Sequence, residues 1–304
     1  MISSHNEYST LRKIIVGDAT HANWPQHDPV FRAEAEHTLW KETPLPSGPV
    51  PQHIIDETNQ DLQGLCDILT KHGVEVVRPI TLNFQTHDGL YNYCPRDRFI
   101  VHGNTIINPA MMYPCRDMEY QCYIDVLESA DRIIHMPRNK GMILDAANIL
   151  RVENNKWLFL ESASGNRAAY DWLCQTLPEV EIELCNFYAG VHIDSTIVAL
   201  NQDTFIVNGS RVTAQTLPQM LQGKNVIFVD EVVPQGFYQY PYASKWIALN
   251  MLSIDPQTVI VDRHQTSLIS TLELQGFTVI PHELRHSRTL GGGFHCVTLD
   301  LIRD

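Results

Sequence analysis

Short apolar runs separated by polar turns recur along the chain in one arrangement. In residues 94–109 (CPRDRFIVHGNTIINP) a polar opening precedes an apolar run, a turn and a second apolar run. Paired runs of this kind around a short polar turn predict a β-hairpin. The same arrangement is found at residues 144–162 (LDAANILRVENNKWLFLES), 192–211 (HIDSTIVALNQDTFIVNGSR) and 244–262 (SKWIALNMLSIDPQTVIVD), and it begins again at 294–302 (FHCVTLDLI).

A helix-like stretch and a short apolar run follow each complete hairpin. The helix-like stretches are residues 119–132, 166–178, 212–223 and 265–276, and the runs after them read IIHMP, VEIELC, VIFV and FTVI. Each unit is therefore predicted to be a ββαβ module, in which a helix connects the hairpin to a third strand.

The polar residues that open the units are regularly spaced. They are Asp97, Asp145, Asp194, Ser244 and Cys296, at intervals of about 50 residues, and a repeat of this period is typical of a propeller or an array. Helices and strands alternate in many α/β proteins, so the regular spacing is what favours a repeat here. We expect an α/β fold in which five ββαβ modules form a five-bladed propeller and bring these five residues to a central active site.

The fifth unit contains one strand and needs a second to complete its hairpin. Residues 11–17 (LRKIIVG), near the start of the chain, form the apolar run that best fits this position. Such pairing would leave no exposed sheet edge and would place Cys296 in the middle of the molecule. Between these parts, residues 20–50 are rich in Pro and His and predict a long, partly helical loop. Residues 54–73 show helical apolar spacing that stops at a glycine, and residues 74–80 then predict a strand.

Composition narrows the class of protein. The 304 residues are 44% hydrophobic and 19% charged, as in an ordinary globular protein, and we expect one domain over residues 1–304. The net charge of −13 argues against a nucleic-acid partner and is compatible with a cationic substrate. The seven cysteines are widely spaced without a CxxC pair, which favours a reduced, cytoplasmic protein. No apolar window is long enough for a membrane span.

Five segments resemble the signature segments of the glycine amidinotransferase family. They read LGGGFHCVTLDLIR, GVHIDSTIVAL, LDAANILR, CPRD and YASKWIALN, and the match extends in order over nearly the whole chain. The family is one of the guanidino-group-modifying enzymes of the pentein fold, a five-bladed α/β propeller. The resemblance implies L-arginine as amidino donor, an amine as acceptor, no metal or organic cofactor, and assembly as a homodimer.

The resemblance also implies a role for each opening residue. Cys296 would be the nucleophile, with His192 as general acid and base and Asp145 as its partner. Asp97 and Asp194 would hold the guanidinium group, since carboxylates match its planar fork of N–H donors. The α-carboxylate of arginine would bind Arg211, with Ser244 beside it. Gly291, Gly292 and Gly293 would let the backbone approach the substrate without Cβ atoms.

Without the resemblance, other interpretations of these residues stay open. A single cysteine is usually a small buried apolar residue, and a single histidine is more often structural than catalytic. Asp97 and Asp194 have the sequence context of turn or capping residues, and Arg211 that of an exposed loop arginine. Residues 282–286 (HELRH) match the HExxH zinc pattern, but they follow an apolar strand containing Pro281, and we expect a loop above the site.

Three functions remain possible from the sequence. The first is an arginine:amine amidinotransferase, and the second is a hydrolase of the same superfamily in which water replaces the amine. The third is an arginine-binding module without turnover. Vertebrate relatives carry a serine at the position of Ala243 and a methionine at that of Val191, and both positions border the expected pocket. Glycine is therefore not assumed as the acceptor.

Overall fold

The computed structural model describes residues 2–37, 44–188 and 190–304. Within this part of the chain lie five three-stranded sheets and one two-stranded sheet, and none of them closes into a barrel. The predicted repeat is present in four of the three-stranded sheets. Each consists of an antiparallel hairpin and a third strand that runs parallel to the second.

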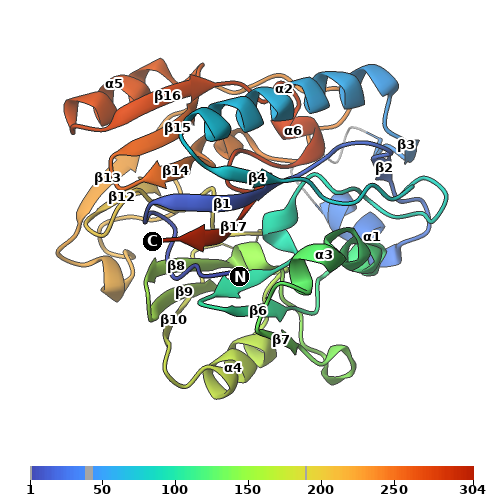
Figure 1. Ribbon diagram of the computed structural model, residues 1–304, viewed down its shortest axis with the longest axis horizontal. Coiled ribbons are helices and arrows are strands. Elements are labelled where there is room, and N and C mark those ends of the chain that lie inside the picture. Colours follow the sequence, from blue (N-terminus) through green and yellow to red (C-terminus); the bar gives the residue numbers. More distant parts are fainter. Residues whose placement is uncertain (1, 38–43, 189) are drawn as a thin grey trace.

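Figure 1 shows how these elements are arranged. The four repeated sheets are β5 (Ile100–His102), β6 (Thr105–Asn108) and β7 (Arg132–His135); β8 (Ile149–Glu153), β9 (Lys156–Leu160) and β10 (Glu181–Cys185); β11 (Ile197–Ala199), β12 (Thr204–Asn208) and β13 (Asn225–Val229); and β14 (Leu252–Asp255), β15 (Thr258–Asp262) and β16 (Thr278–His282). The two-stranded sheet pairs β2 (Asn23–Trp24) with β3 (Gly48–Pro49).

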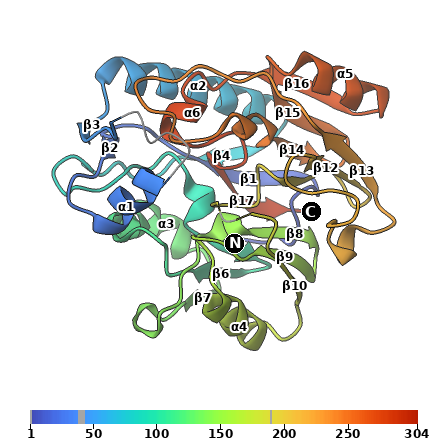
Figure 2. The same cartoon turned by 180° about the vertical axis from the view of Figure 1, so that it is seen from behind.

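The fifth sheet joins distant parts of the sequence, as predicted. Strand β1 (Leu11–Val16) pairs antiparallel with β17 (Thr298–Arg303), and β4 (Glu75–Val77) lies parallel to β1 on its other side. The strand that completes the last hairpin is therefore the one expected from the run LRKIIVG. Figures 1 and 2 place β1 and β17 side by side between the other sheets, so Cys296, just before β17, lies in the interior.

The helices were predicted less evenly. The α-helices are α1 (Pro29–His37), α2 (Gln52–Lys71), α3 (Ile124–Leu127), α4 (Arg167–Thr176), α5 (Thr266–Leu274) and α6 (Ser287–Leu290). In both views α2, α4 and α5 lie at the periphery of the molecule. Helix α2 buries the predicted apolar face and ends just before Gly73, whose φ of +77° suits a helix stop.

Two expected helices differ from the prediction. Residues 114–123 form a 3₁₀ helix, η2 (Pro114–Tyr123), and only the short α3 is α-helical. The predicted helix at residues 212–223 is wrong, because only η5 (Gln219–Leu221) is helical there. Pro218 lacks the backbone N–H that a helix interior needs, and the Thr213–Thr216 turn is closed by its own hydrogen bonds instead.

The core is divided among the spaces between neighbouring sheets. In β9, Trp157 and Phe159 join a cluster with residues of β5 and β6, whereas Leu158 and Leu160 join one with residues of β11 and β12. Successive side chains of a strand point to opposite faces, so a strand with apolar neighbours on both faces is apolar throughout. This explains why the hairpin strands read as continuous apolar runs rather than alternating ones.

None of the described helices has the length and apolar character needed to cross a membrane. The expected loop at residues 20–50 contains β2, α1 and β3, and its residues 38–43 lie outside the described part of the chain.

Candidate active site

Short 3₁₀ turns precede three of the hairpins and hold their opening residues. Asp97 is the last residue of η1 (Pro95–Asp97), while Asp145 and Ser244 cap the starts of η4 (Ala146–Asn148) and η6 (Lys245–Leu249). A strand buried in the core follows each turn. The packing of that strand therefore fixes the position of the opening residue.

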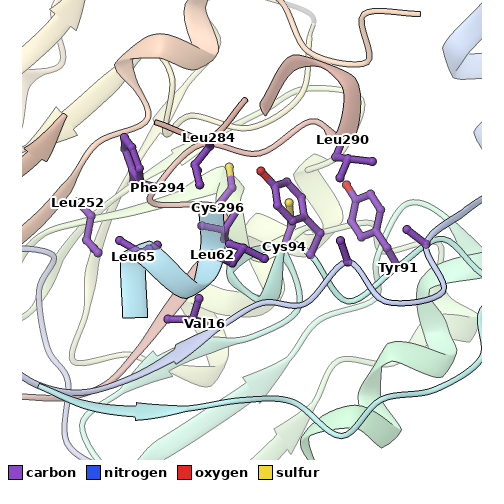
Figure 3. Close-up of a cluster of buried hydrophobic side chains, with 14 of the residues drawn as sticks. Val16, Leu62, Leu65, Tyr91, Cys94, Leu252, Leu284, Leu290, Phe294 and Cys296 are labelled. Carbon is purple, nitrogen blue, oxygen red and sulfur yellow. The ribbon is translucent and has the colours of Figure 1, made fainter. Parts of the chain in front are cut away.

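Cys296 is held from two sides. Its side chain is 1% exposed, and Figure 3 shows it among apolar side chains that include Leu62 and Phe294. The thiol donates to Asp194 Oδ2 over 3.2 Å, and the backbone N–H donates to Asn250 Oδ1 over 2.8 Å. The amide group of Asn250 also donates to the Asp194 carbonyl. Asn250 therefore fixes the thiol and the carboxylate relative to each other.

The three glycines before Cys296 do something other than expected. A Cβ on Gly292 would lie 2.6 Å from Cys94 Sγ, and one on Gly293 would lie 2.6 Å from Asn250 Cβ. Gly291 has a φ of +81° and faces the Tyr242 ring. The space that a side chain would need is thus filled by protein atoms. These glycines are required for close packing behind Cys296, whereas the sequence predicted an approach to the substrate.

His192 is surrounded by carboxylates. Its Nε2 lies 3.1 Å from Asp145 Oδ2, and its Nδ1 lies 3.6 Å from Asp97 Oδ1. Burial by itself lowers the pKa of His192, but Asp97, Asp145 and Asp194 together outweigh it and raise the pKa to about 9. The second oxygen of Asp145 accepts from the Met112 backbone N–H over 2.9 Å. His192 is therefore held as a cation at neutral pH in a fixed orientation.

The two carboxylate oxygens of Asp97 differ in their hydrogen bonding. Oδ2 accepts from Arg116 Nη1 over 2.7 Å, whereas the buried Oδ1 receives no hydrogen bond from any residue that the structure describes. Arg116 also binds Glu119 through two hydrogen bonds, so the Arg116 charge is already balanced by a second carboxylate. Burial raises the pKa of Asp97. A buried acceptor without a partner is costly, and here it faces the site.

Asp194 belongs to a buried chain of hydrogen bonds. Its Oδ2 also binds His295 Nδ1 at 2.9 Å, and His295 Nε2 lies 3.1 Å from Glu7 Oε2. Burial favours the neutral carboxyl, but the bonded and charged His295 more than offsets this and lowers the pKa of Asp194 to about 2. Asp194 is therefore ionised beside the thiol.

Cys296 and His192 share their neighbours. Burial raises the pKa of the Cys296 thiol, and the charges of Asp194 and Asp97 raise it further, well above its usual value. The same two carboxylates raise the pKa of His192. The thiol and imidazole therefore lie around one acidic centre, which favours the thiol over the thiolate.

Arg211 and Ser244 lie together at a separate part of the site. Arg211 Nη1 donates to Thr196 Oγ1 over 2.7 Å and to Ser195 Oγ over 3.3 Å, and its Nη2 donates to Ser244 Oγ over 3.4 Å. The Arg211 guanidinium carbon lies 4.3 Å from the centre of the Tyr188 ring. Every one of these partners is uncharged, and burial lowers the pKa of Arg211. Within the described part of the chain, the hydrogen bonds of this largely buried cation all go to hydroxyl groups, which suits it to an anionic ligand.

Sequence reasoning missed the residues that support this arrangement. Asn250 and His295 stand within the signature segments but were given no role, and their adjacency to the matched residues is the signal that could have found them. Glu7 and Arg116 had no such signal, because their contacts join residues far apart in the sequence. Tyr188 also lies outside the matched segments, so no signal in the sequence pointed to it.

The HELRH segment connects two elements and does not form a helix. Strand β16 ends at His282, whose Nε2 bonds the Asp61 carbonyl at 2.9 Å, while His286 Nε2 bonds Glu57 Oε2 at 2.6 Å. Arg285 also binds the Asp61 carboxylate. The two imidazoles therefore hold different parts of α2, as expected for a loop rather than a zinc-binding helix.

Comparison with known proteins identifies the family. The chain is 37% identical to inosamine-phosphate amidinotransferase 1 of Streptomyces glaucescens, over 100% of this chain and 97% of that protein. The chain belongs to the amidinotransferase family. Mitochondrial glycine amidinotransferase of Xenopus tropicalis is also similar, with 25% identity over 99% of this chain and 83% of its own length. No protein-family model matches.

The solved structures agree with this assignment. The inosamine-phosphate amidinotransferase of Streptomyces griseus superimposes with a TM-score of 0.93 and 35% identity, over 100% of this chain and 97% of that one. The amidinotransferase fold and an amidinotransferase activity are therefore features of this chain, and the resemblance seen in the signature segments is confirmed.

Proposed function

We propose that this amidinotransferase moves the amidino group of L-arginine to an acceptor amine through a covalent adduct on Cys296 and releases L-ornithine. The observation that carries the proposal is that the site contains both a pair of buried carboxylates and a buried arginine, which suit ligand groups of opposite charge. Two buried carboxylates, Asp97 and Asp194, lie around Cys296 and suit a cation. Arg211 is a largely buried cation whose hydrogen bonds, among residues 2–37, 44–188 and 190–304, go to hydroxyl groups. Arginine carries a guanidinium at one end and a carboxylate at the other, so it matches both.

In the first half-reaction Asp97 and Asp194 hold the guanidinium group while Arg211 and Ser244 hold the α-carboxylate. Burial and nearby negative charge raise the pKa of Cys296. The bound cation offsets that charge, so the thiol loses its proton to the solvent and the thiolate becomes favoured. Its sulfur attacks the guanidino carbon, the bond from that carbon to the ornithine nitrogen breaks, and protonated His192 gives its proton to the departing amine.

In the second half-reaction the acceptor amine attacks the amidino carbon. His192, now neutral, takes a proton from the amine, the carbon–sulfur bond breaks, and Cys296 is restored. Asp145 keeps the imidazole oriented through the 3.1 Å contact to Nε2 in both halves. This is double-displacement catalysis with a cysteine nucleophile and needs no metal or organic cofactor.

We propose an inosamine phosphate rather than glycine as the acceptor to test first. Support comes from the greater identity to inosamine-phosphate amidinotransferases, 37% compared with 25% for the glycine enzyme. Val191 and Ala243, which differ from the vertebrate residues expected at these positions, flank His192 and Ser244.

Mass spectrometry of the protein after incubation with arginine tests the covalent step. We expect an amidino adduct that appears with free ornithine, is absent in Cys296→Ala, and is removed by the acceptor amine. Steady formation of citrulline or urea from arginine alone would instead favour the hydrolase. An unmodified protein that binds arginine without any product would favour the binding module.

Further expectations from the sequence are part of this proposal. The five sheets would be blades of a propeller in a single domain spanning residues 1–304, supported by apolar clusters that join neighbouring sheets. The enzyme would assemble as a homodimer in the cytoplasm. Light scattering of the purified protein tests the assembly, and a monomer at working concentration would contradict it.

A further inference from the structure

Tyr188 lies between the proposed carboxylate anchor and the proposed general acid. It belongs to the segment that connects β10 to His192. The face of its ring covers the Arg211 guanidinium group, with the central carbon 4.3 Å from the ring centre. Its single O–H group contacts the carbonyl oxygens of Val191, at 2.8 Å, and of His192, and donates a hydrogen bond shared between them. One side chain thus touches both functional residues.

The hydroxyl contact supports an uncommon backbone conformation. His192 has a φ of +58°, in the left-handed region that residues other than glycine rarely adopt. Such a conformation is strained and persists only where surrounding contacts impose it. The Tyr188 hydroxyl group shares its one donor hydrogen between the carbonyl oxygens of Val191 and His192, on either side of the His192 Cα, and so holds the turn that presents the imidazole to Asp145 and Asp97.

The ring contact restricts Arg211. The hydroxyl groups of Thr196 and Ser244 accept from the edge of the guanidinium plane, and the Tyr188 ring covers its face. Stacking of a guanidinium on an aromatic face is attractive and fixes the plane of the cation. Arg211 is therefore oriented before any anion arrives.

We propose that Tyr188 is a positioning residue that couples the carboxylate anchor at Arg211 to the acid–base group at His192. This inference rests on the proposed function, because it assigns consequences to arginine binding and to proton transfer. Its two contacts use different parts of one side chain, so they can be removed separately.

Two variants separate the contacts. Tyr188→Phe keeps the ring on Arg211 and loses the hydroxyl group, so kcat should fall by about tenfold, as for the loss of one hydrogen bond, with KM for arginine nearly unchanged. Tyr188→Leu also removes the aromatic face, so KM for arginine should rise by about tenfold relative to the wild type, in addition to the loss in kcat. Agmatine, a guanidine without a carboxylate, should show the kcat loss in both variants but no additional rise in KM with Tyr188→Leu.

Tyr170→Phe is the matched control. The Tyr170 hydroxyl group also donates to a backbone carbonyl, that of Ile182 over 3.1 Å, and it lies on α4 away from the site. This variant should retain the kcat and KM of the wild type. Thermal unfolding of all three variants should show cooperative transitions, which separates a positioning effect from a failure to fold.

The outcomes are distinguishable. If the wild type converts arginine but Tyr188→Phe keeps full kcat, or if Tyr188→Leu raises KM equally for arginine and agmatine, the coupling role is overturned while the proposed function stands. If the wild type forms neither ornithine nor an adduct from arginine, the proposed function fails and the inference fails with it.

Discussion

At the scale of single residues, the site is built from groups whose ordinary chemistry is changed by their neighbours. Although burial lowers it, the pKa of His192 is raised to about 9 by nearby carboxylates. The pKa of the Cys296 thiol is raised well above its usual value by burial and by nearby carboxylates. At neutral pH the free enzyme therefore holds a charged imidazole and a neutral thiol. In the proposed mechanism the thiol ionises when arginine binds. Burial is the larger cause of the Cys296 shift and opposes the His192 shift, while Asp194 and Asp97 raise the pKa of both groups.

The first prediction concerns the pH dependence of adduct formation. Departure of ornithine requires protonated His192, so the single-turnover rate of adduct formation should fall as pH rises through about 9. Asp145→Asn removes a carboxylate that raises this pKa, and the residual activity should therefore fall at lower pH. Rapid-quench mass spectrometry across the pH range measures both profiles. If the rate of adduct formation falls over the same pH range in Asp145→Asn as in the wild type, His192 is not the group that protonates ornithine.

The second prediction concerns Gly293. A methyl group there would lie 2.6 Å from Asn250 Cβ, and displacement of Asn250 would release the Cys296 backbone N–H. We expect Gly293→Ala to be destabilised by about 1–3 kcal/mol through overpacking and to lose at least tenfold in kcat. Gly236→Ala is the control, since apart from its chain neighbours no described residue has an atom within 4 Å of the added methyl group. Equal activity of the two variants would show that the close packing is unimportant.

At the scale of elements, the sequence predicted strands better than helices. The apolar runs of β8, β9, β14 and β15 were correctly placed because both faces of these strands are buried, which leaves an uninterrupted apolar signal. At residues 212–223 the apolar spacing was also helical, but Pro218 and the threonine turn prevented the helix. Local hydrogen-bond chemistry prevailed there over periodicity.

The third prediction concerns the loop between β16 and α6. Its HELRH residues bind α2 through Asp61 and Glu57, so they are expected to stabilise the packing of that helix without taking part in chemistry. Asp61→Asn should lower the melting temperature by roughly 1–4 °C, as for a partly exposed ion pair, and leave kcat unchanged. Activity should also survive a metal chelator. Loss of activity on chelation, restored by zinc, would reverse this interpretation.

At the scale of the whole molecule, a buried charged network joins the beginning of the chain to the site. Glu7 binds Arg151 Nε at 2.8 Å and lies near Arg96 and His295, while Asp300 of β17 binds the same two arginines. Burial by itself raises the pKa of Glu7, but Arg151 and His295 outweigh burial and lower this pKa well below its usual value. The segment before β1 is thus part of the support for Asp194.

The fourth prediction concerns this network. Glu7→Gln removes one charge from a buried, hydrogen-bonded group and should cost about 3–5 kcal/mol in unfolding free energy, measured in urea. Activity should fall as well, because His295 loses one anchor. The stabilisation due to Glu7 is present above its unfolded pKa near 4.5 and is lost as pH falls through the lower folded value. The variant should therefore lose less stability on acidification than the wild type.

Glu75→Gln is the comparison for this experiment, because Glu75 forms an exposed ion pair with Lys13. That variant should change stability by less than about 1 kcal/mol. If Glu7→Gln is as stable as Glu75→Gln, the network is not needed to hold the fold.

The limits of sequence prediction at this scale follow from the same contacts. The spacing of the opening residues and the family motifs located Asp97, Asp145, His192, Asp194 and Cys296, which the structure gathers around one acidic centre. The charges that balance them, on Glu7 and Arg116, come from segments with no motif. Partners separated widely along the chain leave no local pattern, so only three-dimensional contacts reveal them.

The pairing of β1 with β17 has a consequence for how the chain folds during its synthesis on the ribosome. Strand β1 is translated long before its antiparallel neighbour β17, so the sheet beside Cys296 cannot be completed until β17 has emerged. Until then the nascent chain carries the β17-facing edge of β1 unpaired, which is a hazard for aggregation. A truncation before Thr298 would therefore yield a protein without its closing strand, and we expect cells to degrade that product rather than accumulate it as a folded, idle enzyme.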